Sequence, residues 1–327
     1  VVGAHDTSSL SVARLDASGS MLIADHILDS PVTRLQGISA LDTISHGDFA
    51  FVAAGGADGG VSLFSVLPGG RLVHLDSIAD DAAMSLYRVS SIEMTISGDR
   101  LDLLVSSAWE QGITRIGYDL STLGALLIAA PSGGSVTGTP ADDQITGSNL
   151  DDTLAGGPGA DTIADGAGED ELTGGSGADL FVLHPDGQTD VVTDFDRSED
   201  RLDLSAFDFL YDTSQLSLTP TADGAILAYG AEVLEIHTSN ALPLAASELS
   251  NEMILNVSRT PLLPFQQDLV GSAAADTLNG AAGDDTISGA GGDDVLTGQA
   301  GNDTIAGGAG DDTLDGGSGA DTLAGQS

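Results

Sequence analysis

The chain has 327 residues, with 50 acidic residues, 9 basic residues that are all arginine, no cysteine, and a formal net charge of −41. This charge excludes a nucleic-acid partner, because affinity for a phosphate backbone comes from basic groups. Without lysine there is no Schiff-base or phosphate-loop lysine, and without cysteine there is neither a disulfide nor a thiolate metal site. The longest apolar run, residues 123–130, is too short for a membrane span, which needs about 20 residues.

Residues 1–130 contain a weak internal repeat with a period of about 51 residues. The clearest copy has four strand-like runs, near residues 61–66, 72–77, 91–96 and 101–107. Four strands per repeat are typical of a propeller blade, and the stretch resembles lactonase-like propellers of secreted bacterial proteins. A propeller closes with about 4 to 8 blades, and this sequence supplies about two and a half. We therefore expect an incomplete propeller in a chain that is part of a larger protein.

After a linker at residues 131–137, residues 138–182 divide into five blocks of nine residues. The blocks read GTPADDQIT, GSNLDDTLA, GGPGADTIA, DGAGEDELT and GGSGADLFV. Glycines at the first, second and fourth positions let the chain turn sharply, and the last three residues form a short strand with one inward apolar side chain. The pattern predicts a flattened coil of turns and strands. The sixth residue is always aspartate: Asp143, Asp152, Asp161, Asp170 and Asp179.

Residues 183–255 alternate apolar residues with aspartates, as short half-buried strands do. We expect them to form a β-sandwich-like segment that packs on the coil, with a hairpin within residues 216–236. Arg197 and Arg201 are expected to pair locally. Four aspartates in this segment could either bind a metal ion or form a solvated acidic edge. They are Asp190, Asp194, Asp196 and Asp200.

After a linker at residues 256–270, residues 271–327 contain six more blocks of the same kind. Their sixth residues are Asp276, Asp285, Asp294, Asp303, Asp312 and Asp321. The two arrays together hold 20 acidic residues and no basic residue. Stacked carboxylates cannot pack without a cation between them. Oxygen ligands from carboxylates and backbone carbonyls suit calcium better than magnesium or zinc.

The blocks match the pattern G-G-x-G-x-D-x-U-x, in which U is a large apolar residue, and so resemble the calcium-binding nonapeptide of RTX proteins, which form a parallel β-roll. The first array with its following segment also resembles serralysin-type C-terminal domains, in which that segment packs on the roll and can hold a further calcium. The resemblance covers 99 of the 327 residues directly. The competing interpretation is a glycine-rich acidic linker.

In that family, one ion takes the carbonyls of the second and fourth positions and the aspartate of one block. It also takes the carbonyls of the first and third positions and the aspartate two blocks on. The resemblance implies about three ions in the first array and four in the second, with the first site of each array the weakest. Besides the aspartates named above, it implies these ligands: Gly157, Gly159, Gly174, Ser176, Ala281, Gly283, Gly289, Ala290, Gly291, Gly292, Gly298, Gln299, Ala300, Gly301, Gly307, Ala309, Gly316 and Ser318.

No catalytic residue can be assigned from the sequence. The metalloprotease motif H-E-x-x-H and the nucleophile motif G-x-S-x-G do not occur, and the six histidines lie at no ligand spacing. Trp109 and Glu110 lie near the end of an expected blade, where we expect the tryptophan to be a packed aromatic. We therefore expect that this chain is not an enzyme by itself.

The sequence thus predicts an all-β chain of N-terminal propeller-like repeats and two parallel β-rolls with a β-sandwich-like segment between them. The RTX resemblance implies a secreted calcium-binding protein that leaves the cell unfolded by type I secretion and folds on calcium outside. It would act as a scaffold or surface-assembly module, with calcium, a second copy or a matrix as partner. Two alternatives stay open: the C-terminal region of a larger secreted lactonase or hydrolase, and a carbohydrate-binding module.

Overall fold

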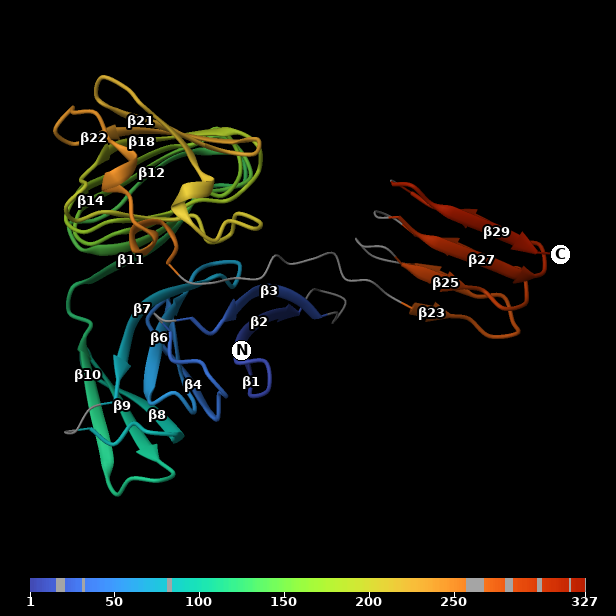
Figure 1. Ribbon diagram of the computed structural model, residues 1–327, viewed down its shortest axis with the longest axis horizontal. Coiled ribbons are helices and arrows are strands. Elements are labelled where there is room, and N and C mark those ends of the chain that lie inside the picture. Colours follow the sequence, from blue (N-terminus) through green and yellow to red (C-terminus); the bar gives the residue numbers. More distant parts are fainter. Residues whose placement is uncertain are drawn as a thin grey trace. The chain divides into compact units, whose positions relative to one another are not determined.

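The computed structural model describes residues 1–15, 21–30, 33–80, 84–256, 268–279, 285–298, 302–317 and 319–326. The chain divides into two units, Val1–Pro261 and Leu262–Ser327. The regular secondary structure of the described residues is almost entirely strand (Figure 1), which confirms the all-β prediction. The helical elements among them are one turn each: η1 (Thr213–Gln215), η2 (Ala246–Glu248) and α1 (Asn251–Ile254). No helix in these ranges is long and apolar enough to cross a membrane.

The N-terminal part of the first unit consists of antiparallel sheets of three, four and three strands. Each sheet pairs strands that follow one another in the sequence, and inward apolar residues such as Leu63, Leu101 and Leu103 are buried between sheets. The strands are β1 (Val2–Ala4), β2 (Ser9–Leu15) and β3 (Met21–Leu28); β4 (Ala40–His46), β5 (Phe49–Gly55), β6 (Gly60–Val66) and β7 (Leu72–Ala79); and β8 (Val89–Ser97), β9 (Arg100–Ser107) and β10 (Ile113–Asp119).

The four strand-like runs expected between residues 61 and 107 are present as β6, β7, β8 and β9. They are divided between two sheets, because β6 and β7 pair with β4 and β5, whereas β8 and β9 pair with β10. The sheet of β4 to β7 has the four strands of a blade. A propeller stays a prediction.

The first array forms a parallel β-roll whose successive blocks alternate between two sheets. One sheet contains β11 (Leu123–Ile128), β13 (Asp142–Thr146), β15 (Thr162–Ala164), β17 (Leu180–Val182) and β19 (Arg201–Asp203). The other contains β12 (Gly134–Thr137), β14 (Asp152–Pro158), β16 (Glu171–Ser176) and β18 (Thr189–Phe195), followed by β22 (Glu232–Thr238), β21 (Gly224–Tyr229) and β20 (Ser217–Pro220). Strands outside the nonapeptides therefore continue the roll at both ends.

The predicted apolar stack fills the interior of this roll. Eighth-position residues pair in register along each sheet, as Ile145 with Ile163 and Ile163 with Phe181, and all are fully buried. Leu202 of β19 and Val192 of β18 extend the two stacks beyond the repeats. The meander of β20, β21 and β22 adds Leu227 and Leu234 to the same core, which agrees with the hairpin expected at residues 216–236.

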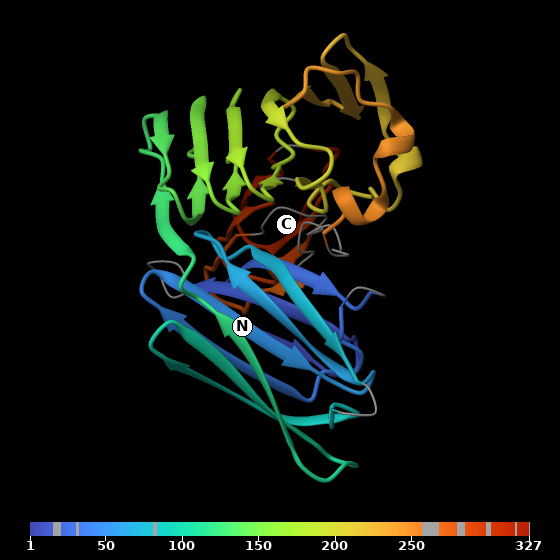
Figure 2. The same cartoon turned by 90° about the vertical axis from the view of Figure 1, so that its left-hand side faces the viewer.

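Within the first unit, the antiparallel sheets pack on the outer face of the roll (Figure 2). Leu67 and Val73, from the β6–β7 hairpin, are buried against Ala164, Leu180 and Val182 of β15 and β17. Gln144 donates a hydrogen bond from Nε2 to Ser65 Oγ. Arg71 Nη2 lies 3.1 Å from Oδ1 of Asp203, whose side chain is completely buried.

The second unit is a smaller parallel roll, which confirms the prediction of two rolls. One sheet contains β23 (Asp268–Val270), β25 (Thr286–Ser288), β27 (Thr304–Ala309) and β29 (Thr322–Gln326), and the other contains β24 (Thr277–Asn279), β26 (Val295–Thr297) and β28 (Thr313–Asp315). Its core is thin, with Ile287, Leu296 and Ile305 fully buried. Most of the expected linker 256–270 lies outside the described residues.

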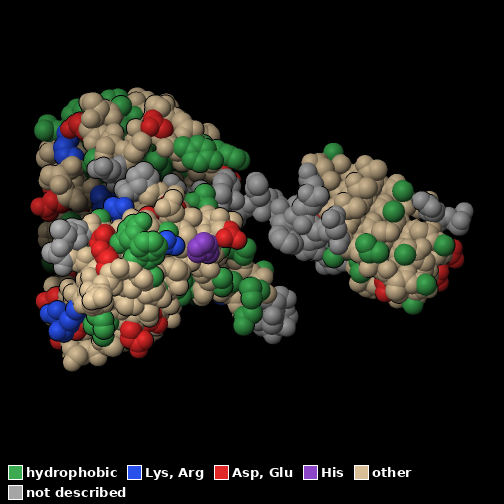
Figure 3. Space-filling model, turned by 60° about the horizontal axis from the view of Figure 1, so that its bottom comes forward, with side chains coloured by type: hydrophobic (Ala, Val, Ile, Leu, Met, Phe, Trp, Pro, Cys, Tyr) green, Lys and Arg blue, Asp and Glu red, His purple; other side chains and the backbone are tan. Residues whose placement is uncertain are grey.

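On the face shown in Figure 3, hydrophobic side chains gather in small separate patches.

Candidate metal centres

The sixth-position aspartates form a ladder along each roll. The backbone N–H of one aspartate donates a hydrogen bond to Oδ1 of the aspartate two blocks on, as Asp161 does to Asp179 at 2.9 Å. The carboxylates of alternate blocks therefore stack on the same side of the roll. The other rungs are Asp143–Asp161, Asp152–Asp170, Asp276–Asp294, Asp285–Asp303, Asp294–Asp312 and Asp303–Asp321, at 2.7–3.0 Å.

The second oxygen of these carboxylates, Oδ2, is left without a donor in the middle of each roll. In the described ranges, six such oxygens are buried and accept no hydrogen bond: those of Asp161, Asp170, Asp179, Asp294, Asp303 and Asp312. A buried carboxylate oxygen without a partner is unfavourable unless a cation faces it. The first blocks differ, since Oδ2 of Asp143, Asp152 and Asp276 accepts the N–H of Thr139, Ser148 and Ser272, respectively.

The first-position glycines keep open the space that these oxygens border. A β-carbon on Gly156 would overlap both Asp161 Oδ2 and the carbonyl oxygen of Gly174, which belongs to the block two further on. These two oxygens therefore border the same space, which a side chain at position 156 would fill. The same arrangement recurs in the second unit at Gly289, with Asp294 and Gly307, and at Gly298, with Asp303 and Gly316.

The carbonyl oxygens of the second and fourth positions of a block point toward the block two further on. Gly157 and Gly159 have φ values of 111° and 137°, which favour glycine. Their carbonyl oxygens lie against the α-carbons of Gly175 and Gly177, two blocks on. In the second unit, the carbonyls of Ala290 and Gly292 lie in the same way against Gly308 and Gly310.

The structure thus gathers most of the expected ligands of one centre between the third and fifth blocks: Gly157, Gly159, Asp161, Gly174 and Asp179. The carbonyl of Ser176 already accepts the N–H of Gly159 at 2.9 Å, and that of Ala309 accepts the N–H of Gly292 at 2.8 Å. Gly291 donates its N–H to the Ser272 carbonyl at 3.2 Å, and the first-position Gly316 lies against Asp321. Six expected ligands lie outside the described residues: Ala281, Gly283, Gln299, Ala300, Gly301 and Ser318.

The donor set fits calcium. Among the described residues, no three carboxylate or imidazole side chains converge on one point, and the expected set for one centre consists of two carboxylates and several backbone carbonyls. Such a set contains only oxygen and is built on flexible turns, which suits calcium and offers zinc no nitrogen or sulfur. The individual ligands stay a prediction.

Burial raises the pKa of the ladder carboxyls. The pKa of Asp161 is raised to about 6, and the pKa values of Asp170 and Asp179 are raised to about 7. The largest cause is desolvation, and the neighbouring carboxylates of the ladder add to it. These groups are therefore poorly suited to carry their negative charge without a counter-ion.

We expect the calcium-free protein to become more stable as the pH falls from 8 to 5. The folded carboxyls bind protons near pH 6 to 7, whereas unfolded carboxyls do so near pH 4. The stabilisation is therefore complete below about pH 4 and is lost as the pH rises through the folded pKa values. Far-ultraviolet circular dichroism of protein stripped of calcium on a chelating resin, at pH 5, 6, 7 and 8, measures how much of the rolls is folded. A β signal that falls from pH 8 to pH 5 contradicts this expectation.

The expectation that Trp109 is a packed aromatic is wrong. Its side chain is 71% exposed, and the Arg88 guanidinium lies 5.2 Å from the centroid of its ring. Hydrogen bonds fix the start of the loop that carries it, because Ser107 Oγ accepts the N–H groups of Trp109 and Glu110. The polar residues around Trp109, in SSAWEQG, are the sequence signal that could have indicated an exposed turn at this position.

Comparison with known families agrees with this geometry. The family model described as the RTX calcium-binding nonapeptide repeat (4 copies) matches residues 146–181, 268–296 and 288–323. No curated protein sequence matches the chain. Among solved structures, the chain is similar to the AlgE6R3 subunit of the mannuronan C5-epimerase from Azotobacter vinelandii. The two are 27% identical with a TM-score of 0.30, over 38% of this chain and 78% of that one.

Proposed function

The chain carries RTX calcium-binding nonapeptide repeats, and from this premise we propose that its two β-rolls fold on binding calcium outside the cell and serve as a scaffold. The observation that carries the proposal is the set of six buried Oδ2 atoms that accept no hydrogen bond in the described ranges. They lie on aspartates that stack two blocks apart, so each roll contains rows of like charges. The repeats account for about three ions in the first array and four in the second.

The thin apolar core and the stacked carboxylates of the rolls make their folding depend on bound calcium. Among the described residues of the second roll, three large apolar side chains are fully buried, those of Ile287, Leu296 and Ile305, and its strands are three to six residues long. Such a core is too thin to hold stacked carboxylates together against their repulsion. A bound calcium ion supplies the positive charge that the facing carboxylates lack. Binding free energy then becomes folding free energy.

Location and export follow from the calcium level that the donor set requires. Centres built from two carboxylates and several carbonyls suit extracellular modules, with Kd values of about 10⁻⁴ to 10⁻³ M. At cytosolic calcium levels the arrays would stay open, which suits passage through a type I secretion channel. We therefore propose a secreted, cell-surface or matrix protein, with calcium and further copies of the chain as its partners.

A second candidate is the stabilising region of a larger secreted hydrolase or lactonase. The observation that favours it is the packing of the antiparallel sheets on the roll through Leu67, Val73 and Leu180, because this contact would let a calcium-loaded roll stabilise an upstream domain. Hydrolysis of lactones or esters that is lost on changes in the antiparallel sheets but kept on changes in the second roll would favour this candidate over a scaffold.

The test of the main proposal is a calcium titration of the chelated protein followed by far-ultraviolet circular dichroism, with magnesium as the control. We expect a cooperative gain of β signal at about millimolar calcium and no gain with magnesium. A β spectrum that is the same with and without calcium contradicts calcium-dependent folding. A gain that magnesium reproduces contradicts the assignment of the ion.

A further inference from the structure

The single tryptophan of the chain lies on the surface, in the turn between β9 and β10. The Trp109 side chain is 71% exposed, and that of Tyr87, in the segment before β8, is 46% exposed. Both rings carry a large apolar area that the fold leaves in contact with water. Exposed aromatic rings of this kind are the side chains that most often form the centre of a binding site.

Hydrogen bonds hold this turn against the segment before β8. The N–H of Tyr87 donates to Glu110 Oε2 at 2.9 Å, and the N–H of Ala108 donates to the Arg88 carbonyl at 3.0 Å. Ser107 Oγ donates to the Tyr87 carbonyl. The backbone that carries both rings is therefore ordered in advance, which lowers the free-energy cost of binding a ligand.

Arg88 places a positive charge beside the indole from a strained backbone position. Its guanidinium lies 5.2 Å from the centroid of the Trp109 ring. Its φ is 55°, in the left-handed region that residues with a β-carbon rarely adopt. Strain of this kind is concentrated at functional sites. A glycine would avoid the strain but would remove the guanidinium, so the side chain itself is the feature that needs an explanation.

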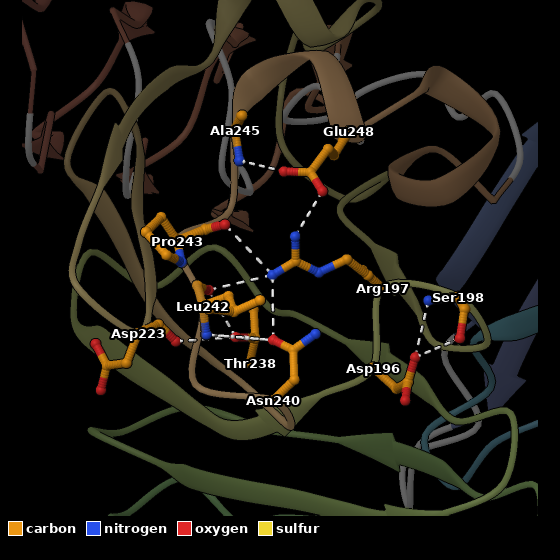
Figure 4. A network of polar contacts seen from close by, with 10 residues as sticks. All are labelled: Asp196, Arg197, Ser198, Asp223, Thr238, Asn240, Leu242, Pro243, Ala245 and Glu248. Carbon is orange, nitrogen blue, oxygen red and sulfur yellow. Dashed lines mark hydrogen bonds and ion pairs between the residues drawn. The ribbon is translucent and has the colours of Figure 1, made fainter.

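The guanidinium of Arg88 is available to a ligand, in contrast to that of Arg197. Arg197 forms an ion pair with Glu248 at 2.6 Å and donates to the carbonyls of Leu242 and Pro243 at 3.1 and 3.3 Å (Figure 4). The expectation that Arg197 pairs locally is therefore wrong, since Glu248 lies 51 residues away in the sequence. In the part of the chain that the structure describes, the Arg88 side chain forms no ion pair and donates no hydrogen bond.

The chemistry of this surface fits a sugar ring. We call it the aromatic patch and define it by Tyr87, Arg88, Trp109, Glu110 and Gln111. A sugar ring has an apolar face of C–H groups, which packs on an aromatic ring, and a rim of hydroxyl groups that donate and accept hydrogen bonds. The guanidinium, the carboxylate and the amide of the patch supply both donors and acceptors next to the indole.

The charge of the chain favours an uncharged polysaccharide over an acidic one. A net charge of −41 repels polyanions and anionic membrane surfaces. A protein partner is less suited to the patch, because a stable protein interface needs about 800 Å² on each partner with an apolar centre. Here the polar residues Ser85, Ser107 and Gln111 adjoin the two rings.

We propose that the aromatic patch binds a neutral polysaccharide, with one sugar ring stacked on Trp109 and its hydroxyl groups hydrogen-bonded to Arg88 and Glu110. The patch contains no residue of the candidate metal centres, so the inference goes beyond the proposed function. It gives the chain a means of attachment to a glycan matrix that is separate from its β-rolls.

The test uses the fluorescence of Trp109, which reports on this site alone because the chain has no other tryptophan. The full chain at saturating calcium is titrated with neutral oligosaccharides of glucose and of N-acetylglucosamine. We expect the emission to shift to shorter wavelength and acrylamide to quench it less, because a stacked sugar removes the indole from water. An emission spectrum that no neutral sugar changes overturns the proposal.

Variants separate a binding role from a structural one, with the affinity measured by isothermal titration calorimetry. We expect Trp109→Ala to bind the sugar about tenfold more weakly, as for the loss of one aromatic contact. Arg88→Gly should also bind more weakly but should unfold at no lower temperature, because glycine adopts a positive φ without strain. The matched control is Tyr211→Ala, which removes another exposed aromatic ring, 64% exposed, and should keep its affinity.

Other ligands are distinguished by the same fluorescence shift. A shift with an oligomer of uronic acid, and none with the neutral sugars, overturns the assignment to an uncharged ligand. A shift only with phosphatidylcholine vesicles, or only on raising the concentration of the chain, would assign the patch to a membrane or to a second copy and overturns the proposal. Equal weakening by Tyr211→Ala and Trp109→Ala overturns the location of the site.

Discussion

Gly156→Ala is expected to remove the calcium ion held between the third and fifth blocks and to destabilise the first roll. The added methyl group would overlap Asp161 Oδ2 and the Gly174 carbonyl, two oxygens of the same centre. Overpacking of this kind costs about 1–3 kcal/mol. The lost ion adds about 1.4 kcal/mol when free calcium is ten times the Kd. Ion counting and urea unfolding at fixed free calcium measure the two effects.

The matched control is Gly325→Ala. A β-carbon there would meet no atom within 4 Å, and Gly325 does not have a positive φ. We expect this variant to keep its ions and its stability. Equal behaviour of the two alanine variants, with no ion lost from either, would contradict the placement of a cation beside Gly156.

Arg71→Ala is expected to have the second large effect, a loss of about 3–5 kcal/mol from the free energy of unfolding. The change removes the positive charge that lies 3.1 Å from the fully buried carboxylate of Asp203, between the β6–β7 hairpin and the roll. Ser205 donates hydrogen bonds to the same carboxylate, but a neutral donor does not replace the positive charge. Denaturation at saturating calcium, followed by circular dichroism, measures the loss.

Arg115→Ala is the control for this prediction, because the Arg115 side chain is 59% exposed and the Asp102 carboxylate with which it pairs keeps a second partner, Arg100, at 2.8 Å. We expect a loss of about 0–1 kcal/mol, as for ion pairs of exposed side chains. The double variant Arg71→Met with Asp203→Leu should recover most of the stability, since apolar residues of similar size can replace a buried pair. A loss in Arg71→Ala no larger than that in Arg115→Ala would show that the buried pair contributes little.

The rolls could be predicted from the sequence because two positions of each block carry separate physical roles. The eighth residue is apolar and becomes the buried stack, as Ile145, Ile163 and Phe181 show. The sixth is aspartate and becomes the ladder. A period that is kept over many turns fixes the register of parallel strands, so the repeat alone specifies this part of the fold.

What the sequence could not predict depends on contacts between segments without a shared pattern. β11 and β12 join the roll although they precede the first nonapeptide, and Asp190 and Asp200 join the ladder at irregular spacing. Arg71 and Asp203 meet only because the β6–β7 hairpin packs on the roll. In the N-terminal part, the local alternation of apolar and polar residues predicted where the strands lie. It did not predict how these strands are divided among the sheets.

The apolar contact between the β6–β7 hairpin and the first roll is expected to link calcium loss to self-adhesion. Ala164, Leu180 and Val182 occupy outward positions of the first roll and are covered by Leu67 and Val73, whereas outward positions of the second roll carry residues such as Thr286, Thr304 and Thr313. Loss of calcium from the first roll would expose this hydrophobic surface to solvent and separate Arg71 from Asp203. Because exposed hydrophobic surfaces associate, chelation is expected to cause aggregation of the chain, and storage buffers for it should contain calcium.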